Sequence, residues 1–186
     1  PNEVLCPYWQ YAWQQGLELT ALMLDCYEHT RDAKFLNEEL IPMAHSVLSY
    51  YDTRFQRDAN GKLVISPTQA VETYWYGVTN DTPSVAGLHD VLDRLLLVEA
   101  PASEREFWQR MKAATPALPL RDGRVTMAEA FKPERSNVEN PELFAIWPST
   151  ISARQRSFAT ASTTDLMNGH PASKSWKARS NWISIC

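Results

Sequence analysis

Apolar residues recur at helical spacing in two neighbouring stretches near the start of this chain. The first runs from Leu17 to Tyr27 and predicts a largely buried helix, and the second runs from Phe35 to Tyr51. A polar break at 30–32 separates them, so an αα-hairpin is expected, with Asp32 as the cap of its second helix. Pro42 should kink that helix or mark its effective start, because proline lacks an amide hydrogen and clashes with the preceding turn.

A third apolar stripe follows Thr82-Pro83, where proline suits an early helical position. A shorter helix is expected from Ser103 to Ala114, with Ser103 as N-cap and Glu106 as its capping-box partner. The chain body therefore reads as helix pairs joined by long loops. The residues of the third stripe are Val85, Leu88, Val91, Leu92, Leu95 and Leu96.

The connections between these helices carry turn signals and little regular pattern. A turn is expected at 58–62, and the short β-prone run 63–65 stops at Ser66-Pro67. A long connection then leads to Asp81. A second turn is expected at 121–124, and Met127 to Phe131 is expected to form a single helical turn.

The character of the sequence changes after Pro148. Residues 149–186 are rich in Ser, Thr, Ala and Arg and lack a sustained apolar period, so little in them can bury a core. We expect a folded domain over 1–148, which the resemblance described below implies is part of a catalytic domain, and, over 149–186, a basic tail that is disordered or foreign to the fold. The tail's charged residues are Arg154, Arg156, Lys174, Lys177 and Arg179, against Asp165.

Composition and charge narrow the classes of partner. The 186 residues are 44% hydrophobic and 22% charged, which suits one globular domain, and the net charge of -4 argues against nucleic acid. No run reaches the length of a membrane span and no signal peptide opens the chain, so a soluble protein of undetermined compartment is expected. Three separated cysteines and four unpaired histidines give no metal motif, so neither a metal nor another cofactor is predicted.

The candidate chemistry centres on Glu72. This carboxylate stands among polar and aromatic residues, a mixture typical of sugar sites, where aromatic rings stack on the C–H faces of a pyranose and polar groups bind its hydroxyls. An ordinary aromatic corner of the core is the alternative. The neighbouring candidates for substrate binding are Gln69, Trp75, Asn80 and Asp81.

A second polar stretch, 135–148, adds Asn137, Glu139 and Glu142 as candidates for substrate binding. Together with Asp81, the two glutamates are also candidates for the second carboxylate of a hydrolase. Alternatives remain for each of them: Asp81 can cap the helix that begins at Pro83, the glutamates can hold loops, and Asn137 can bond its own backbone in a turn.

Three segments resemble a known family. Ser66-Pro67-Thr68-Gln69-Ala70-Val71-Glu72 resembles a Ser-Pro-x-x-x-Pro-Glu segment of glycoside hydrolase family 95, the inverting α-L-fucosidases, within the six-hairpin glycosidases. Asn80-Asp81 resembles the start of the family's following helix. Leu143-Phe144-Ala145-Ile146-Trp147-Pro148 resembles its Leu-Phe-Gly-Leu-Tyr-Pro ending. The resemblance covers about Tyr8 to Pro148.

The resemblance implies an all-α fold, a fragment of an (α/α)6 toroid of helical hairpins with long loops. It places Glu72 as the general acid of inverting hydrolysis, in which a second carboxylate activates water. The family has paired histidines upstream of Leu143, where this chain has Glu139 and Glu142, which implies different substrate contacts. The family's base lies beyond the position of Pro148, so the rest of the barrel is an expected partner.

The expected function is therefore that of a glycoside hydrolase-like protein acting on or binding carbohydrate, with an α-L-fucoside as one substrate, and inactive as a fragment if the base is missing. The alternative is a noncatalytic helical carbohydrate-binding or scaffold protein. A truncated product without a function of its own is the third hypothesis.

Overall fold

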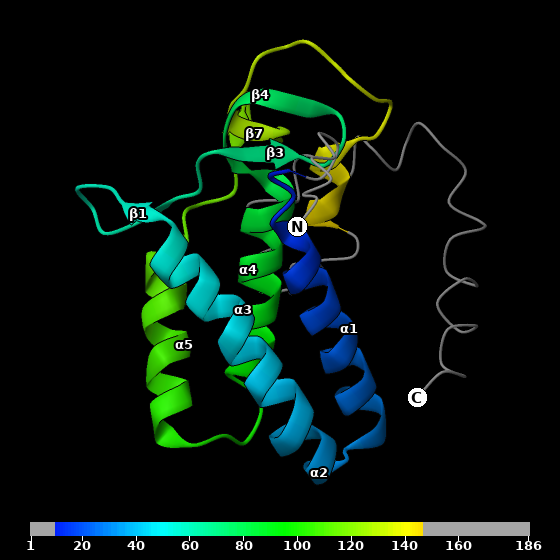
Figure 1. Ribbon diagram of the computed structural model, residues 1–186, viewed down its shortest axis with the longest axis vertical. Helices are drawn as coiled ribbons and strands as arrows, with labels where there is room; N and C mark the ends of the chain where they lie inside the picture. Colours follow the sequence, from blue (N-terminus) through cyan, green and yellow to red (C-terminus); the bar gives the residue numbers. More distant parts are fainter. Residues whose placement is uncertain (1–9, 147–186) are drawn as a thin grey trace, which may run out of the picture.

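The computed structural model describes residues 10–146, which form a mixed α/β fold (Figure 1). Four α-helices of 13 or more residues lie alongside one another: α1 (Gln14–Thr30), α3 (Ile41–Arg54), α4 (Thr82–Leu95) and α5 (Ala102–Ala114). Short helical segments occur at α2 (Ala33–Phe35), at a π-helix (Leu36–Leu40) and at a 3-10 helix (Pro141–Ala145). The predicted tail at 149–186 lies outside the described residues.

Three small antiparallel sheets accompany the helices. One pairs β1 (Gln56–Arg57) with β2 (Leu63–Val64), and another pairs β5 (Leu120–Arg121) with β6 (Arg124–Val125). The third has the order β3-β4-β7 and stands at one end of the helices (Figure 1). Its strands are β3 (Thr68–Ala70), β4 (Tyr74–Asp81) and β7 (Ala128–Ala130).

The prediction of an all-α toroid fragment was wrong, because the stretch interpreted as a long loop holds the longest strand. Tyr74, Val78 and Thr79 are residues that favour strands, and β4 is central in its sheet, with Thr68 of β3 opposite Val78 and Ala130 of β7 opposite Thr79. The single helical turn expected at Met127 to Phe131 was also wrong. Residues Ala128–Ala130 form strand β7, whose backbone pairs with β4. Ala128 of β7 packs with Tyr74 and Val78 of β4 in a small buried cluster.

The helix boundaries follow from capping and proline. Asp32 caps α2 by accepting hydrogen bonds from the amides of Lys34 (2.8 Å) and Phe35 (3.2 Å), as predicted. Pro42 lies in the first turn of α3, and the preceding π-helix ends at Leu40, so proline marks the start of a regular helix. The predicted cap at Ser103 was wrong: α5 begins at Ala102 after Pro101, with no side-chain cap.

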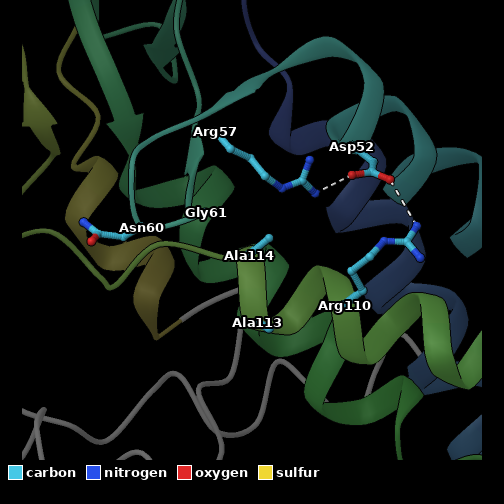
Figure 2. A pocket seen from close by; sticks show the side chains of 7 residues that line it. All are labelled: Asp52, Arg57, Asn60, Gly61, Arg110, Ala113 and Ala114. Atoms are coloured by element: carbon cyan, nitrogen blue, oxygen red, sulfur yellow. Dashed lines mark hydrogen bonds and ion pairs between the residues drawn. The ribbon is translucent and has the colours of Figure 1, made fainter.

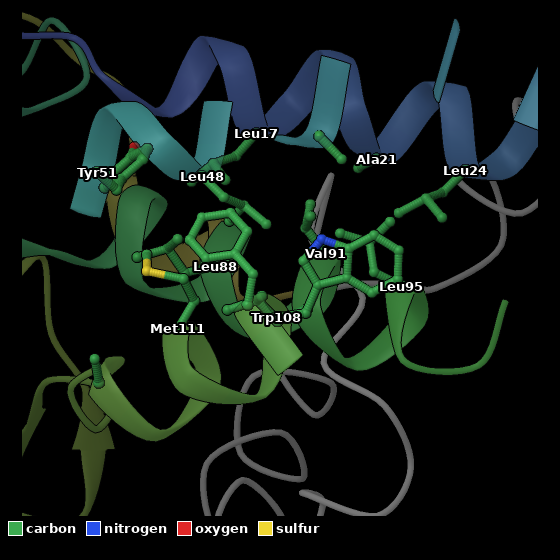
Figure 3. Close-up of a cluster of buried hydrophobic side chains, with 14 of the residues drawn as sticks. Leu17, Ala21, Leu24, Leu48, Tyr51, Leu88, Val91, Leu95, Trp108 and Met111 are labelled. Atoms are coloured by element: carbon green, nitrogen blue, oxygen red, sulfur yellow. The ribbon is translucent and has the colours of Figure 1, made fainter. Parts of the chain in front are cut away.

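The core lies between the four long helices (Figure 3). Trp108 of α5 is fully buried there, together with Leu88 of α4, Leu48 of α3 and Leu24 of α1. On the outer side of α1, Leu19 is 46% and Leu22 60% exposed, so this helix is less buried than its composition predicted. Among residues 10–146, no helix combines the length and apolar character needed to cross a membrane.

Gly87 sets the close approach of α4 to α1. A Cβ atom at this position would lie 3.0 Å from both Cβ and Cδ1 of Leu17. We expect Gly87→Ala to lower the free energy of unfolding by about 1–2 kcal/mol, because the overpacking outweighs the better helix propensity of alanine. Urea unfolding would measure this change.

Gly16→Ala is the matched control for that substitution. Its methyl group would lie 3.1 and 3.2 Å from the two γ-methyl groups of Val47, and this half-buried side chain has more room to shift than the buried Leu17. A smaller loss than at Gly87 is expected. Stabilisation by Gly87→Ala would show that α1 and α4 separate easily.

Candidate functional site

Glu72 lies in the tight turn that joins β3 to β4. The turn closes with a hydrogen bond from the Thr73 amide to the Ala70 carbonyl (3.3 Å), and Val71 has a positive φ of 46°. An L-residue with a side chain rarely adopts this backbone conformation, so the surroundings must hold the turn. The result is a half-exposed Glu72 side chain at the edge of the sheet.

Segment 135–139 lies against this turn and supplies two partners for Glu72. The Asn137 side-chain amide donates to Oε2 of Glu72 (2.8 Å), and the Glu72 backbone amide donates to Oε2 of Glu139 (2.9 Å). Among the described residues, Oε1 of Glu72 has no hydrogen-bond partner. The structure thus brings together three of the candidate residues, from two segments about 65 positions apart in the sequence.

Backbone contacts fasten the same segment. The Ser136 amide donates to the Thr73 carbonyl (2.8 Å), and the Thr73 hydroxyl donates to the Glu139 carbonyl (3.2 Å). Arg135 also donates to that carbonyl (3.1 Å). Arg135 and Ser136 had not been singled out from sequence, although they directly precede Asn137. The segment has no regular secondary structure, so these bonds define its position.

Trp75 completes the group. Its indole N–H donates to the backbone carbonyl of Glu72 (2.7 Å), which fixes a half-buried ring at the β3–β4 turn. Tyr76 is 59% exposed and meets Trp75 edge to face, with 6.4 Å between ring centroids. We call Glu72, Trp75, Asn137 and Glu139 the Glu72 group. At the protein surface this group presents two carboxylates, one amide and an aromatic ring, and the exposed ring of Tyr76 lies next to Trp75.

Gln69 and Asn80 are buried and bind backbone or protein side chains. The Gln69 side chain accepts from the Tyr11 amide (2.7 Å) and donates to the Val71 carbonyl (3.0 Å). Asn80 accepts from the Ile65 amide (2.8 Å) and donates to Glu129 (2.6 Å). Gln69 therefore ties Tyr11 to β3, Asn80 ties β4 to β7 and to Ile65, and neither belongs to the Glu72 group.

Asp81 is fully buried and caps α4. Its Oδ1 accepts from the Ser84 amide (2.8 Å), and its Oδ2 accepts from the Thr68 hydroxyl (2.6 Å). Burial raises the pKa of this carboxyl to about 6, against the lowering effect of those hydrogen bonds. The capping alternative for Asp81 is confirmed. A carboxylate with no exposed surface is poorly placed to activate a substrate water.

Glu142 lies in the 3-10 helix, half-buried, and no hydrogen bond joins it to the Glu72 group. Within residues 10–146, no group of three or more His, Cys, Asp or Glu side chains is arranged to hold a metal ion. Comparison of the sequence with protein-family models and with curated proteins finds no match. The chemistry of the site must therefore be argued from its residues.

Proposed function

We propose that this chain is a glycoside hydrolase-like protein that binds carbohydrate at the Glu72 group, with Glu72 as the general acid of inverting hydrolysis. The observation that carries the proposal is the hydrogen bond from Asn137 to Oε2 of Glu72 beside an anchored Trp75. An aromatic ring, an amide and carboxylates are the groups that a sugar's apolar face and hydroxyls require.

The hydrogen bond from Asn137 gives the two oxygens of the Glu72 carboxyl group different roles. Asn137 holds Oε2, so the proton to be donated is carried on Oε1, which has no partner among residues 10–146. Transfer of this proton to the glycosidic oxygen lets the C–O bond break with its electron pair on the leaving oxygen. An inverting enzyme also needs a carboxylate on the opposite face of the sugar to remove a proton from water.

Glu139 is the second carboxylate of the Glu72 group. Its Oε2 accepts from the Glu72 amide, so it is already oriented toward the same surface. We assign it to substrate binding beside Glu72. The resemblance of segment 66–72 to the α-L-fucosidases makes an α-L-fucoside the first substrate to test.

The second candidate function is that of a noncatalytic carbohydrate-binding protein. The burial of Asp81 favours it, because this leaves Glu139 and Glu142 as the candidates for a base, and Glu139 already binds the Glu72 backbone. Both functions require sugar affinity at Trp75. They differ in whether a bound glycoside is cleaved.

The experiment is a panel of aryl glycosides that includes α-L-fucoside, offered to the purified chain, together with titration of the corresponding free sugars. Turnover with inversion of the anomeric centre supports the hydrolase. Sugar binding without turnover supports the binding protein. The absence of both binding and turnover for every sugar would contradict both functions.

Trp75→Ala is expected to weaken sugar binding about tenfold, because the stacking surface beside Glu72 is lost. Isothermal titration calorimetry with the best sugar of the panel would measure the change. Leu97→Ala is the control, since Leu97 is 83% exposed and lies beyond the end of α4. Equal affinities of wild type and Trp75→Ala would place the sugar elsewhere.

A further inference from the structure

A hollow of about 420 Å³ lies between the β1–β2 turn and the last turn of α5 (Figure 2). It contains none of the residues of the Glu72 group. Small side chains on α5 and a glycine in the turn leave the space open, and charged side chains from α3, β1 and α5 surround it. The lining residues are Asp52, Arg57, Asn60, Gly61, Arg110, Ala113 and Ala114.

Asp52 orients two guanidinium groups at this hollow. Its Oδ1 accepts from Arg57 (2.5 Å) and its Oδ2 from Arg110 (3.3 Å), and Figure 2 shows both side chains pointing toward it from different elements. Each arginine uses one nitrogen for this contact. A guanidinium carries five N–H donors, and no further hydrogen bond is made by Arg57 or Arg110 within residues 10–146. Donors therefore remain for another acceptor.

The pairing is reflected in the pKa of Asp52, which is lowered. Partial burial acts to raise it, and the hydrogen bonds and charges of Arg57 and Arg110 outweigh burial. Asp52 stays ionised at neutral pH and holds both arginines in place. The side chain of Arg110 is nevertheless 61% exposed, so it is accessible to a solute.

Lys62 lowers the repulsion that the C-terminal end of α5 would exert on an anion. The last carbonyls of a helix carry partial negative charge, and here Nζ of Lys62 donates to the carbonyls of Ala113 (2.7 Å) and Thr115 (3.2 Å). The cations Arg57, Arg110 and Lys62 face the carboxylates of Asp52 and Asp58, which leaves one positive charge in excess. This local excess contrasts with the net charge of -4 of the whole chain.

We propose that this hollow binds a small-molecule oxyanion, a carboxylate or a phosphate group, which bridges Arg57 and Arg110. The fork of a guanidinium matches the paired oxygens of either group, and two forks held by one aspartate are preorganised for it. The site is independent of the Glu72 group and of the proposed hydrolysis.

Calorimetric titration of the full chain tests this site, with inorganic phosphate and glucuronate as probes at low ionic strength. Binding above that of chloride is expected, and it should weaken with added salt. Arg57→Gln and Arg110→Gln should each reduce the affinity about tenfold, through loss of a charge-assisted hydrogen bond. Arg31→Gln, at the opposite end of the helices, should leave it unchanged. Preference for phosphate points to a phosphate ester, and preference for glucuronate points to an acidic sugar.

Asp52→Asn tests whether the hollow is an anion-binding site or only a surface ion pair. Asparagine keeps an oxygen that can accept from an arginine, so the guanidinium groups stay at the hollow. The loss of a competing negative charge should then let phosphate or glucuronate bind severalfold more tightly. This variant carries the test alone if an arginine variant fails to fold. Failure of both probes to exceed chloride, or equal affinity in wild type and Asp52→Asn, would overturn the proposal.

Discussion

Glu72→Gln is expected to lower kcat on glycosides with poor leaving groups by about 10²–10⁴-fold, the usual contribution of a positioned acid. Glutamine keeps the size of the side chain and an oxygen that can accept the hydrogen bond of the Asn137 amide, but it has no acidic proton to transfer. Aryl glycosides with good leaving groups should lose less, because their leaving oxygen needs little protonation. The ratio of the two losses is the quantity to measure.

Glu142→Gln is the control for that comparison, since Glu142 makes no hydrogen bond to the Glu72 group. This substitution should lower kcat by the same factor on glycosides with poor and with good leaving groups, or leave kcat unchanged on both. A Glu72→Gln variant that keeps full turnover on poor leaving groups would remove Glu72 from the mechanism. Sugar affinity measured on the same variant shows whether binding at the Glu72 group survives.

Asp81 is expected to make the fold less stable as the pH rises from about 4 to above 6. Its pKa is about 6 in the folded chain against an ordinary value of 3.8. The folded state therefore binds the proton more tightly, and this stabilisation is fully present below about pH 4 and is lost as the pH rises through 6. Two pKa units correspond to about 3 kcal/mol.

Comparison of wild type with Asp81→Asn isolates this contribution, because the other carboxylates titrate alike in both. Asparagine can still accept from the Ser84 amide, so the cap of α4 is retained. Urea unfolding between pH 4 and 7.5 should show the variant gaining about 3 kcal/mol relative to wild type as the pH rises. A difference that is independent of pH would show that Asp81 is solvated.

Asp58→Asn gives the opposite sign. The backbone amides of Lys62 and Asn60 donate to the Asp58 carboxylate, and the Lys62 hydrogen bond is the largest cause of its lowered pKa. The stability that Asp58 contributes is therefore lost as the pH falls, and the substitution should matter least in acid.

The helices could be predicted because their signals are local. The apolar period around Leu88, the cap at Asp32 and the prolines at 42 and 83 each act within one or two turns of chain. Strand β4 was missed although its partner β3 is adjacent in the sequence, because burial along β4 does not alternate strictly. Its other partner, β7, lies about 50 residues away, and no local sequence pattern indicates that pairing. An aromatic and polar stretch without helical period was therefore interpreted as a loop.

The same difference between local and distant contacts applies to the candidate site. Glu72 and Trp75 are near in sequence and proved to be near in space. The polar character of Gln69 and Asn80 suggested ligand contacts, but short strands leave backbone groups unpaired, and these amides satisfy them. Contact between Glu72 and Asn137 depends on the path of the whole intervening chain, which composition alone does not specify.

The bonds between the β3–β4 turn and segment 135–139 have a consequence for protein engineering. Hydrogen bonds made by Thr73, Ser136 and Glu139 hold together two loops that are separated in the sequence by β4, α4, α5, the β5–β6 sheet and β7. A graft that exchanges either loop alone would break the hydrogen bonds between the two loops and shift the Glu72 carboxyl group. New specificity should therefore be sought by exchanging both loops together, as one cassette.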